Sequence, residues 1–141
     1  MGDFSSLGCR GRLICTSEIV FSDYSRIGYE SVISDSNFHY IKDLKTNLIK
    51  NYSGSIFLGA YNYIGGRVLI HKNTVTPDYC IVAANSICNK DYKSFVPENS
   101  MIGGMPAKLL KGNCVRIFDV EKERNIFEYF KKTNSLEYLD I

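Results

Sequence analysis

The sequence contains no apolar run that could cross a membrane. No stretch approaches the roughly 20 consecutive apolar residues that a bilayer requires, and the first residues, MGDFSSLGCRGR, lack the apolar centre of a secretory signal. We therefore expect a cytoplasmic protein without membrane insertion.

The length of 141 residues is enough for one domain with a core and too short for two domains of ordinary size.

Cysteine pairing motifs are also absent. The five cysteines form no CxxC pair and are odd in number, which argues against a zinc site and against a disulfide framework. We expect reduced thiols that are mostly buried. The chain has two histidines, His39 and His71, so a zinc site with three histidine ligands is not expected.

The chain has no large excess of charge of one sign. Its 17 basic and 15 acidic side chains leave a formal net charge of +2, and the basic residues are scattered along the sequence. Electrostatic capture of nucleic acid is therefore not expected. Small basic sites for a phosphorylated ligand remain compatible with this balance.

The strongest positive signal is an internal period of six residues. Apolar side chains recur every six residues and form a first series. A second series of smaller side chains, including Ser25 and Ser31, lies four places after the members of the first. An amphipathic helix is the competing interpretation, but it would bury charged residues such as Asp23 and Arg26. The first series, which we call the anchors, consists of Cys9, Cys15, Phe21, Ile27 and Ile33 in one run and Leu58, Ile64, Ile70, Thr76, Val82 and Cys88 in another.

This period fits a short extended segment followed by a turn. Three hexads close a triangular coil of about 18 residues, and successive coils stack at the strand spacing of about 4.8 Å. The predicted fold is therefore mainly β, a triangular prism of stacked coils. Glycines that follow anchors, Gly28, Gly59 and Gly65, are expected at turns with positive φ. The predicted pairs of stacked anchors are Cys9 with Ile27, Cys15 with Ile33, Ile64 with Val82, and Ile70 with Cys88.

The spacing breaks between Ile33 and Leu58. These residues are 25 positions apart, which equals one coil of about 18 residues plus about 7 more. We therefore expect a loop at about residues 40–55 that protrudes from one corner of the prism. His39 stands where this loop begins.

The repeat is expected to end after Cys88. Pro97, Pro106 and the pair Gly103 and Gly104 interrupt regular stacking. The segment DVEKERNIFEYFKK then predicts a short amphipathic α-helix that begins at an Asp119 N-cap and packs on the prism or on a neighbouring chain. The expected division is residues 1–114 for the coils and residues 115–141 for a C-terminal helical extension.

Four features together resemble a known family: the two runs of hexads, SDSNFH before the loop, IGGRVLIHKNTVTPDYCIVAANSICNKD in the second run, and the tail IGGMPAKLLK. They are similar to those of the hexapeptide-repeat acyltransferases, in particular the sugar and polysaccharide O-acetyltransferases. The resemblance implies a left-handed parallel β-helix, a coil hand opposite to the usual crossover preference. It also implies acetyl-CoA as co-substrate and a homotrimer with active sites between adjacent subunits.

The resemblance implies that His39 is the catalytic base. Neutral imidazole has a pKa near the working pH, so it can take the proton of a hydroxyl group that attacks a thioester. Asn37 stands where the family motif commonly has an Asp. The group that orients the other ring nitrogen stays open among Asp35, Asp23 and a backbone carbonyl. His71 is expected to point outward, either solvated or lining a groove.

The same resemblance places acetyl-CoA along the second run. Gly66 is the candidate backbone N–H donor to the oxyanion. The inserted loop is expected to bind the acceptor substrate and to determine its specificity. Its Tyr40 and Tyr52 are candidates for stacking on a sugar ring. The residues implied to contact acetyl-CoA are Gly66, Ala83 and Ala84 at turns, Lys90, Lys108 and Lys111 beside the phosphates, and Pro106 near the adenine.

The predicted function is transfer of an acetyl group from acetyl-CoA to a hydroxyl of a sugar or polysaccharide precursor, without a metal. Two other enzyme functions are N-acetylation of a nucleotide-linked amino sugar and O-acetylation of an amino-acid hydroxyl such as that of serine. A function of another class is a non-catalytic solenoid that scaffolds partners. His39 and the GGMPAK tail favour an enzyme, because a scaffold needs neither.

Overall fold

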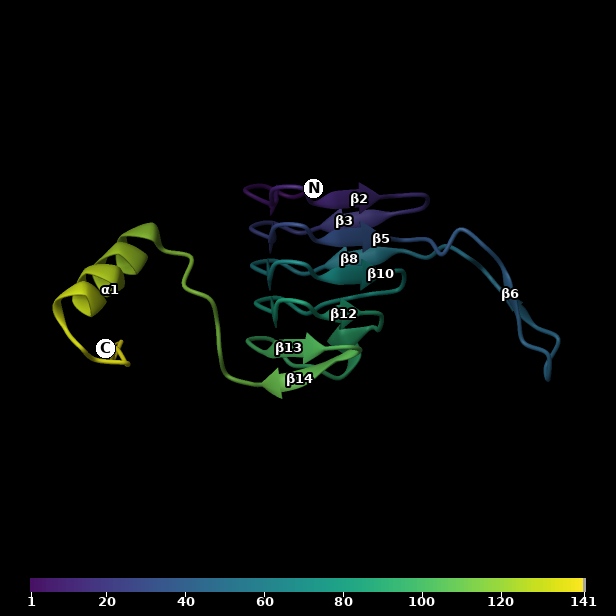
Figure 1. Cartoon of the computed structure of the whole chain (residues 1–141). Helices are drawn as coiled ribbons and strands as arrows, with labels where there is room; N and C mark the ends of the chain where they lie inside the picture. Colours follow the sequence, from purple (N-terminus) through teal and green to yellow (C-terminus); the bar gives the residue numbers. More distant parts are fainter. Residues whose placement is uncertain (141) are drawn as a thin grey trace.

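Short strands stack into a column of triangular coils in this computed structural model, which describes residues 1–140 (Figure 1). Three sheets form the faces of the prism. The first contains β1 (Ser6–Leu7), β4 (Arg26–Ile27), β9 (Tyr63–Ile64), β11 (Ile81–Val82), β13 (Met101–Gly104) and β14 (Ala107–Lys111). The second contains β2 (Arg12–Ile14), β5 (Val32–Ser34), β10 (Leu69–His71) and β12 (Ile87–Cys88), and the third contains β3 (Ile19–Phe21) and β8 (Ile56–Leu58).

The parallel pairing stacks inward side chains of successive coils on one another. The pairs Ile64 with Val82 and Ile70 with Cys88 are in register, as predicted, and all four side chains are buried. The inward side chains of each sheet therefore form a column, and the three columns together make a continuous apolar core. The columns are Leu7, Ile27, Ile64, Val82 and Ile102 in the first sheet, Leu13, Ile33, Ile70 and Cys88 in the second, and Phe21 and Leu58 in the third.

The predicted register of the first coil is wrong. Successive coils such as those of Ile64 and Val82 are 18 residues apart, but the first coil and the next are 20 residues apart. The two additional residues lie in the turn between β2 and β3, so counting by six assigned the wrong partners. The observed pairs are Leu7 instead of Cys9 with Ile27, and Leu13 instead of Cys15 with Ile33.

The thiols are less buried than expected, for the same reason. Cys80 and Cys88 lie inside the prism, where burial raises the pKa of each thiol to about 12. Cys9 and Cys15 are exposed, and Cys114 is partly exposed. The expectation of mostly buried thiols is therefore wrong for the first coil.

Small polar side chains between the anchors hydrogen-bond the backbone of the next coil. Ser25 and Ser31 are fully buried, and their hydroxyl groups donate to the carbonyl oxygens of Gly59 at 2.7 Å and Gly65 at 3.1 Å. Because both of these hydroxyl groups have a partner, their desolvation is compensated. These bonds join neighbouring coils inside the turns as well as along the strands.

The glycines after the anchors serve close stacking, and the prediction of positive φ at these positions is wrong. A Cβ atom at Gly28 would lie 2.6 Å from the carbonyl carbon of Gly65, and one at Gly65 would lie 2.6 Å from the Ala84 nitrogen. The left-handed conformation falls two residues after each of these glycines, at Glu30 with φ 56° and Arg67 with φ 57°. Glycine is needed here because successive turns touch backbone to backbone.

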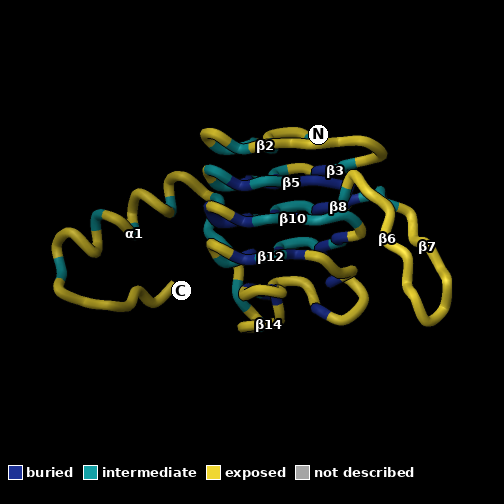
Figure 2. Tube along the Cα trace, turned by 45° about the vertical axis from the view of Figure 1, so that its right-hand side comes forward, coloured by how far each residue is buried: buried dark blue, intermediate teal, exposed yellow. Residues whose placement is uncertain are grey.

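The inserted segment is longer than the spacing predicts. Phe21 and Leu58 are stacked although they are 37 residues apart, which is 19 more than a regular coil. The segment forms a hairpin of β6 (Ile41–Lys42) and β7 (Ile49–Lys50), with a bridge between Ser36 and Ser53 at its base. We call residues 36–53 the hairpin. It projects from one corner of the prism and is almost wholly exposed (Figures 1 and 2).

The repeat continues for one strand beyond Cys88, contrary to the prediction. In β13, Ile102 still stacks on Val82, and β14 then folds back antiparallel along β13. A short 3₁₀ turn, η1 (Tyr92–Ser94), precedes them. Because β14 pairs with the outer edge of the first sheet, it closes that edge.

The C-terminal helix, α1 (Val120–Lys132), begins as predicted. The carboxylate of its N-cap, Asp119, accepts a hydrogen bond of 2.9 Å from the Lys122 amide. The helix has no buried residue and stands apart from the prism (Figure 1), so it does not pack there. Within residues 1–140, no helix is long and apolar enough to span a membrane.

A column of aromatic rings follows one corner of the prism. Phe4, Tyr24, Tyr61 and Tyr79 stack ring on ring, with centroids 4.7–4.9 Å apart. All four have positive φ between 53° and 57°, a strained conformation for residues with large side chains. The stacking contacts compensate part of this strain, since each ring packs on the ring of the next coil.

Candidate active site

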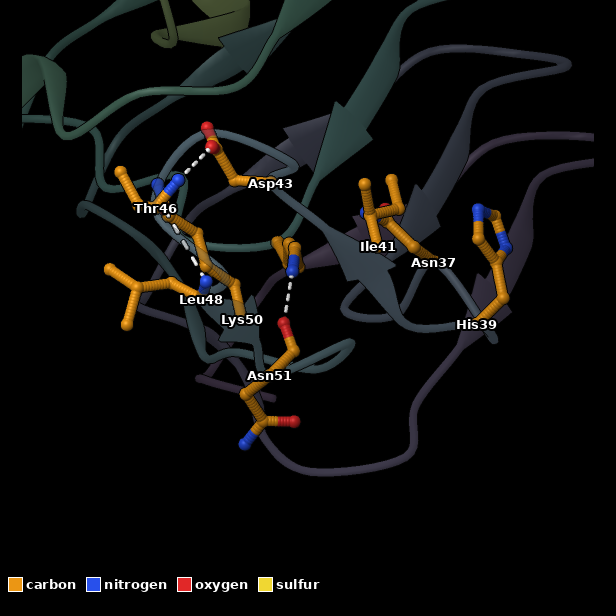
Figure 3. A pocket seen from close by; sticks show the side chains of 9 residues that line it. Asn37, His39, Ile41, Asp43, Thr46, Leu48, Lys50 and Asn51 are labelled. Carbon is orange, nitrogen blue, oxygen red and sulfur yellow. Dashed lines mark hydrogen bonds between the residues drawn. The ribbon is translucent and has the colours of Figure 1, made fainter.

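The hairpin and the corner of the prism enclose a hollow of about 580 Å³. His39 and Asn37 lie at one end of it, and Asp43 and Thr46 lie at the other (Figure 3). Seven of its nine lining residues carry polar or charged groups, while Ile41, Leu48 and the side-chain stems supply apolar surface, a mixture that suits a sugar ring with its hydroxyl groups. The lining residues are Asn37, His39, Ile41, Asp43, Thr46, Leu48, Lys50, Asn51 and Lys72.

The end of β5 and the base of the hairpin position His39. The Asn37 amide donates a hydrogen bond of 2.8 Å to the carbonyl of Tyr52 on the opposite side of the hairpin. Phe38 follows in the left-handed region, with φ 62°, and its amide donates to the Ser36 hydroxyl at 2.9 Å. This turn brings His39 out of the core, where its exposed ring stands beside Asn37 (Figure 3).

Asp35 does not orient His39. Its carboxylate is fully buried and accepts hydrogen bonds from the Thr16 amide at 2.8 Å, the Thr16 hydroxyl at 2.9 Å and the Ser17 amide at 2.6 Å. Burial acts to raise the pKa of Asp35, but these hydrogen bonds outweigh it and hold the pKa below its ordinary value. The carboxylate therefore braces the widened turn of the first coil.

Asp23 is also engaged elsewhere. Its carboxylate accepts a hydrogen bond of 2.8 Å from the Asp3 amide, and its own carbonyl oxygen accepts one from the Tyr61 amide at the corner of the aromatic column. Of the partners left open by the sequence for the second ring nitrogen of His39, neither carboxylate is placed to serve.

A smaller hollow of about 300 Å³ adjoins the first. Its lining comprises Asn37, His71, Lys72, Asn73 and Asn89, so Asn37 and Lys72 belong to both hollows. His71 lines this groove, as expected from its outward position. The register explains the grouping, because β10 and β5 align His71 with Ser34 directly before the hairpin.

Lys72 and Asn51 are site residues that the sequence did not indicate. The Lys72 ammonium donates a hydrogen bond of 2.6 Å to the Asn51 carbonyl oxygen and so ties the prism to the hairpin (Figure 3). The two residues are 21 positions apart, and the bond depends on how the hairpin leaves the corner. One signal was available, since Lys72 follows His71 in the turn next to the insertion.

Tyr40 and Tyr52 meet at the base of the hairpin. Their rings are 5.0 Å apart between centroids and nearly perpendicular, at 80°. Tyr40 is 64% exposed. The pair offers an aromatic surface beside His39, and its contact with an acceptor stays a prediction.

No protein-family model matches the chain. Among solved structures it is similar to the polysialic-acid-specific acetyltransferase NeuO, at 20% identity and a TM-score of 0.76, over 93% of this chain and 62% of that one. It is similar to a hexapeptide-repeat acetyltransferase of Vibrio cholerae in complex with acetyl coenzyme A, at 21% identity and a TM-score of 0.54, over 79% of this chain and 69% of that one. The chain has the fold of these acetyltransferases.

A third similar structure is a variant of AntD, an N-acyltransferase from Bacillus cereus, in complex with dTDP and coenzyme A. Its identity is 16% and its TM-score 0.60, over 92% of this chain and 69% of that one. The likeness to these proteins confirms the predicted left-handed parallel β-helix. The chain spans less than two thirds of the length of NeuO.

In this β-helix, the turns that carry the expected donor residues lie away from His39. Gly66 precedes β10 and His39 follows β5, and these two strands run parallel and paired. The two residues therefore lie beyond opposite ends of the same strip of sheet. A single chain does not bring the Gly66 amide to His39.

Gly66 is also covered. It is buried, and a Cβ atom there would lie 2.5 Å from the ring of Tyr29. Arg67 holds this turn by a hydrogen bond of 2.8 Å to Glu30 and lies over the Tyr29 ring. The role of Gly66 as the oxyanion donor stays a prediction, and it would require His39 to come from another chain. At the equivalent turn of the next coil, Ala84 is exposed.

The remaining expected donor residues lie at two places. Lys90 follows β12 and is exposed near the smaller hollow, since Asn89 lines that hollow. Pro106 forms the turn between β13 and β14, and Lys108 and Lys111 are exposed on β14. Across residues 1–140, no group of three or more His, Cys, Asp or Glu side chains is arranged to hold a metal ion.

Proposed function

We propose that this protein transfers an acetyl group from acetyl-CoA to a hydroxyl group of a sugar or polysaccharide precursor. The observation that carries the proposal is the position of His39, exposed at one end of a hollow of about 580 Å³, next to the hairpin that interrupts an acetyltransferase-type β-helix. The sugar class is supported by the Tyr40 and Tyr52 pair and by the similarity to an acetyltransferase specific for polysialic acid.

In the proposed reaction, His39 acts as general base. Its neutral imidazole takes the proton of the acceptor hydroxyl while the hydroxyl oxygen attacks the thioester carbonyl carbon. The tetrahedral intermediate then collapses with cleavage of the C–S bond. The coenzyme A thiolate leaves and takes the proton from the His39 imidazolium, which returns to neutral imidazole. The products are an acetyl ester and coenzyme A, and such a base contributes roughly 10² to 10⁴ in rate.

We propose that two chains form each site within a homotrimer. The separation of His39 from the turn of Ala84 supports this, because the surface expected to hold the pantetheine arm lies at another corner of the same chain. The hairpin supports it too, since Leu44 is 86% exposed and Leu48 is 63% exposed on an element without a covering surface. A neighbouring chain would cover these side chains and supply the donor groove.

In this arrangement acetyl-CoA lies along the later coils. Ala83 and Ala84 border the pantetheine arm, where small side chains allow its amides to approach the backbone. Lys90, Lys108 and Lys111 face the phosphates as exposed cations. Pro106 lies against the adenine, at the turn that closes the last coil.

A second candidate is N-acetylation of a nucleotide-linked amino sugar. It is supported by the similarity to AntD, an N-acyltransferase solved with dTDP and coenzyme A. An amine acceptor needs the same removal of a proton, so His39 and the hollow serve both reactions. The two are distinguished by the bond formed, an ester or an amide.

The test is acetyl transfer measured by mass spectrometry with acetyl-CoA and a panel of sugars, glycans and nucleotide-linked amino sugars. His39→Ala should lower kcat by roughly 10² to 10⁴, while coenzyme A affinity stays within about threefold. Glu98→Gln, an exposed position away from both hollows, is the control, and it should keep kcat within about threefold. Transfer by His39→Ala within tenfold of the wild type would contradict the proposed role of His39.

Oligomer assembly is tested separately by sedimentation of the same sample with and without coenzyme A. Three chains per particle and one coenzyme A bound per chain are expected. A folded monomer that binds no coenzyme A would contradict both the shared site and the acetyltransferase function, and would favour a non-catalytic scaffold.

A further inference from the structure

We infer that the acceptor recognised at this site is anionic, carrying a carboxylate or a phosphate next to the sugar that is acetylated. This inference rests on the proposed function and concerns the charge of its substrate. It follows from how the few net charges of the chain are distributed, and from the state of the single acid in the hollow.

The hairpin carries the net charge of the whole protein. Its residues include Lys42, Lys45 and Lys50 and one acid, Asp43, which gives a net charge of +2. The complete chain also has a formal net charge of +2, so the rest of the molecule is balanced, with 14 basic and 14 acidic side chains. A cationic arm on an otherwise neutral protein attracts anions to this one corner.

Asp43 does not serve as a partner for a cationic ligand. Its carboxylate accepts hydrogen bonds of 2.8 Å from the amides of Lys45 and Thr46 and thereby shapes the tip of the hairpin. These backbone bonds, with a smaller contribution from the nearby charge of Lys50, hold the pKa of Asp43 below its ordinary value. The one carboxylate of the hollow is thus engaged in local structure.

Two cations face the hollow itself, one from each side. Lys50 comes from β7, and Lys72 comes from the turn after β10 and lines both hollows. Among the ion pairs of residues 1–140, none involves Lys42, Lys45, Lys50 or Lys72. Lys72 donates to a neutral carbonyl oxygen and therefore keeps its positive charge uncompensated.

The remaining polar groups of the wall are amides. Asn37 and Asn51 line the larger hollow, and Asn73 and Asn89 line the smaller one. Amides donate to and accept from sugar hydroxyl groups, and the two lysines supply the charge. The combination fits a glycan unit with an anionic group near Lys50 and Lys72 and its reacting hydroxyl at His39.

The experiment measures binding, so that it does not depend on turnover. The full chain is titrated by ligand-observed NMR with a sialic acid trimer and a galacturonic acid trimer, each beside its methyl ester, and with maltotriose and UDP-glucose. At least one acidic ligand should bind about tenfold more tightly than its uncharged counterpart at 50 mM salt, and the difference should shrink at 500 mM salt. An acidic trimer that binds assigns the anion to a carboxylate, and UDP-glucose alone assigns it to a phosphate.

Paired variants locate the site. Lys50→Gln with Lys72→Gln should weaken binding of the anionic ligand about tenfold, while Lys132→Gln at the end of α1 should change it less than twofold. Thermal unfolding of the same samples confirms that each variant is folded. Equal binding of acid and ester, no binding by any ligand, or unchanged binding by the double variant would each overturn the inference.

Acetyl transfer with the same ligands separates this inference from the proposed function. Transfer to maltotriose with no preference for an acidic acceptor would overturn the inference and support the acetyltransferase function. Tight binding of an acidic trimer without transfer to any acceptor would overturn the acetyltransferase function and support anion recognition by the hairpin.

Discussion

The ammonium group of Lys72 lies 2.6 Å from the carbonyl oxygen of Asn51 and donates a hydrogen bond to it. This contact joins the turn after β10 to the base of the hairpin, across 21 residues of sequence. Few other contacts restrain the hairpin, whose own strands are two residues each and therefore marginal without support.

Lys72→Met should loosen the hairpin without unfolding the prism. Methionine keeps the aliphatic stem and removes the donor, so amide hydrogen exchange should accelerate several-fold in residues 41–52 and stay unchanged in β10. The free energy of unfolding should fall by no more than about 1.5 kcal/mol, the net worth of one hydrogen bond. Lys132→Met is the control, and equal exchange in both variants would contradict the role of this bond.

Asp35→Asn should destabilise the first coil. The carboxylate accepts two amide bonds and one hydroxyl bond within Thr16 and Ser17, and replacing one oxygen by an NH₂ group leaves a buried donor without its acceptor. We expect a loss of about 1–3 kcal/mol in the free energy of unfolding, measured by urea denaturation at neutral pH. Glu98→Gln on the surface is the matched control and should change stability by less than about 0.5 kcal/mol.

The same residue predicts a dependence of stability on pH. The pKa of Asp35 is lower in the folded chain than in the unfolded one, so the unfolded state binds the proton more readily as the pH falls. The contribution of Asp35 is therefore complete above its unfolded pKa, near 4, and is lost as the pH falls through its folded value. Urea midpoints between pH 6 and pH 3 should decline less steeply in Asp35→Asn than in the wild type.

Gly65→Ala should weaken the stacking of coils. The added methyl group would lie 2.6 Å from the Ala84 nitrogen, so the backbones must separate, and overpacking of this kind costs about 1–3 kcal/mol or more. Gly112→Ala is a direct control, because nothing lies within 4 Å of a Cβ atom there. Equal thermal unfolding of the two variants would rule out the close turn-to-turn contact.

Thiol labelling should divide four of the five cysteines into two groups. With maleimide at pH 7 in the native protein, Cys9 and Cys15 should react within minutes because they are exposed. Cys80 and Cys88 should react only after denaturation, because they are buried and their pKa is about 12, which leaves almost no thiolate. Mass spectrometry of the peptides reads each site, and native labelling of Cys88 would contradict the register of β10 and β12.

The hexad period predicted the prism because its interior accepts compact apolar side chains at one position per strand. It could not predict insertions that fall in turns. Cys9 and Cys15 occupied the expected positions by coincidence, so the true partners of Ile27 and Ile33 were missed. The insertion after β5 was underestimated because Ile33 and Leu58 lie on consecutive faces of the prism. In a regular coil such residues are six positions apart.

The candidate site was predicted in part. His39, Tyr40 and Tyr52 lie together at the hairpin base, since they are close to the insertion in sequence. Asp35 was one of the open partners for His39, and its hydrogen bonds to Thr16 could not be inferred from spacing once the first turn is widened. The close packing of Gly66 against Tyr29 could not be inferred, because that ring comes from the preceding coil.

The antiparallel return of β14 along β13 also bears on self-assembly. A column of parallel coils stacked at strand spacing has the same backbone arrangement as the protofilament of a cross-β fibre, and an open final edge would template a further copy. β14 covers the edge of β13 and carries two exposed lysines, Lys108 and Lys111, and charged side chains on an edge strand disfavour pairing with another chain. The pair of β13 and β14 thus ends the stack of coils, so that an architecture resembling that of a fibre forms a particle of defined length.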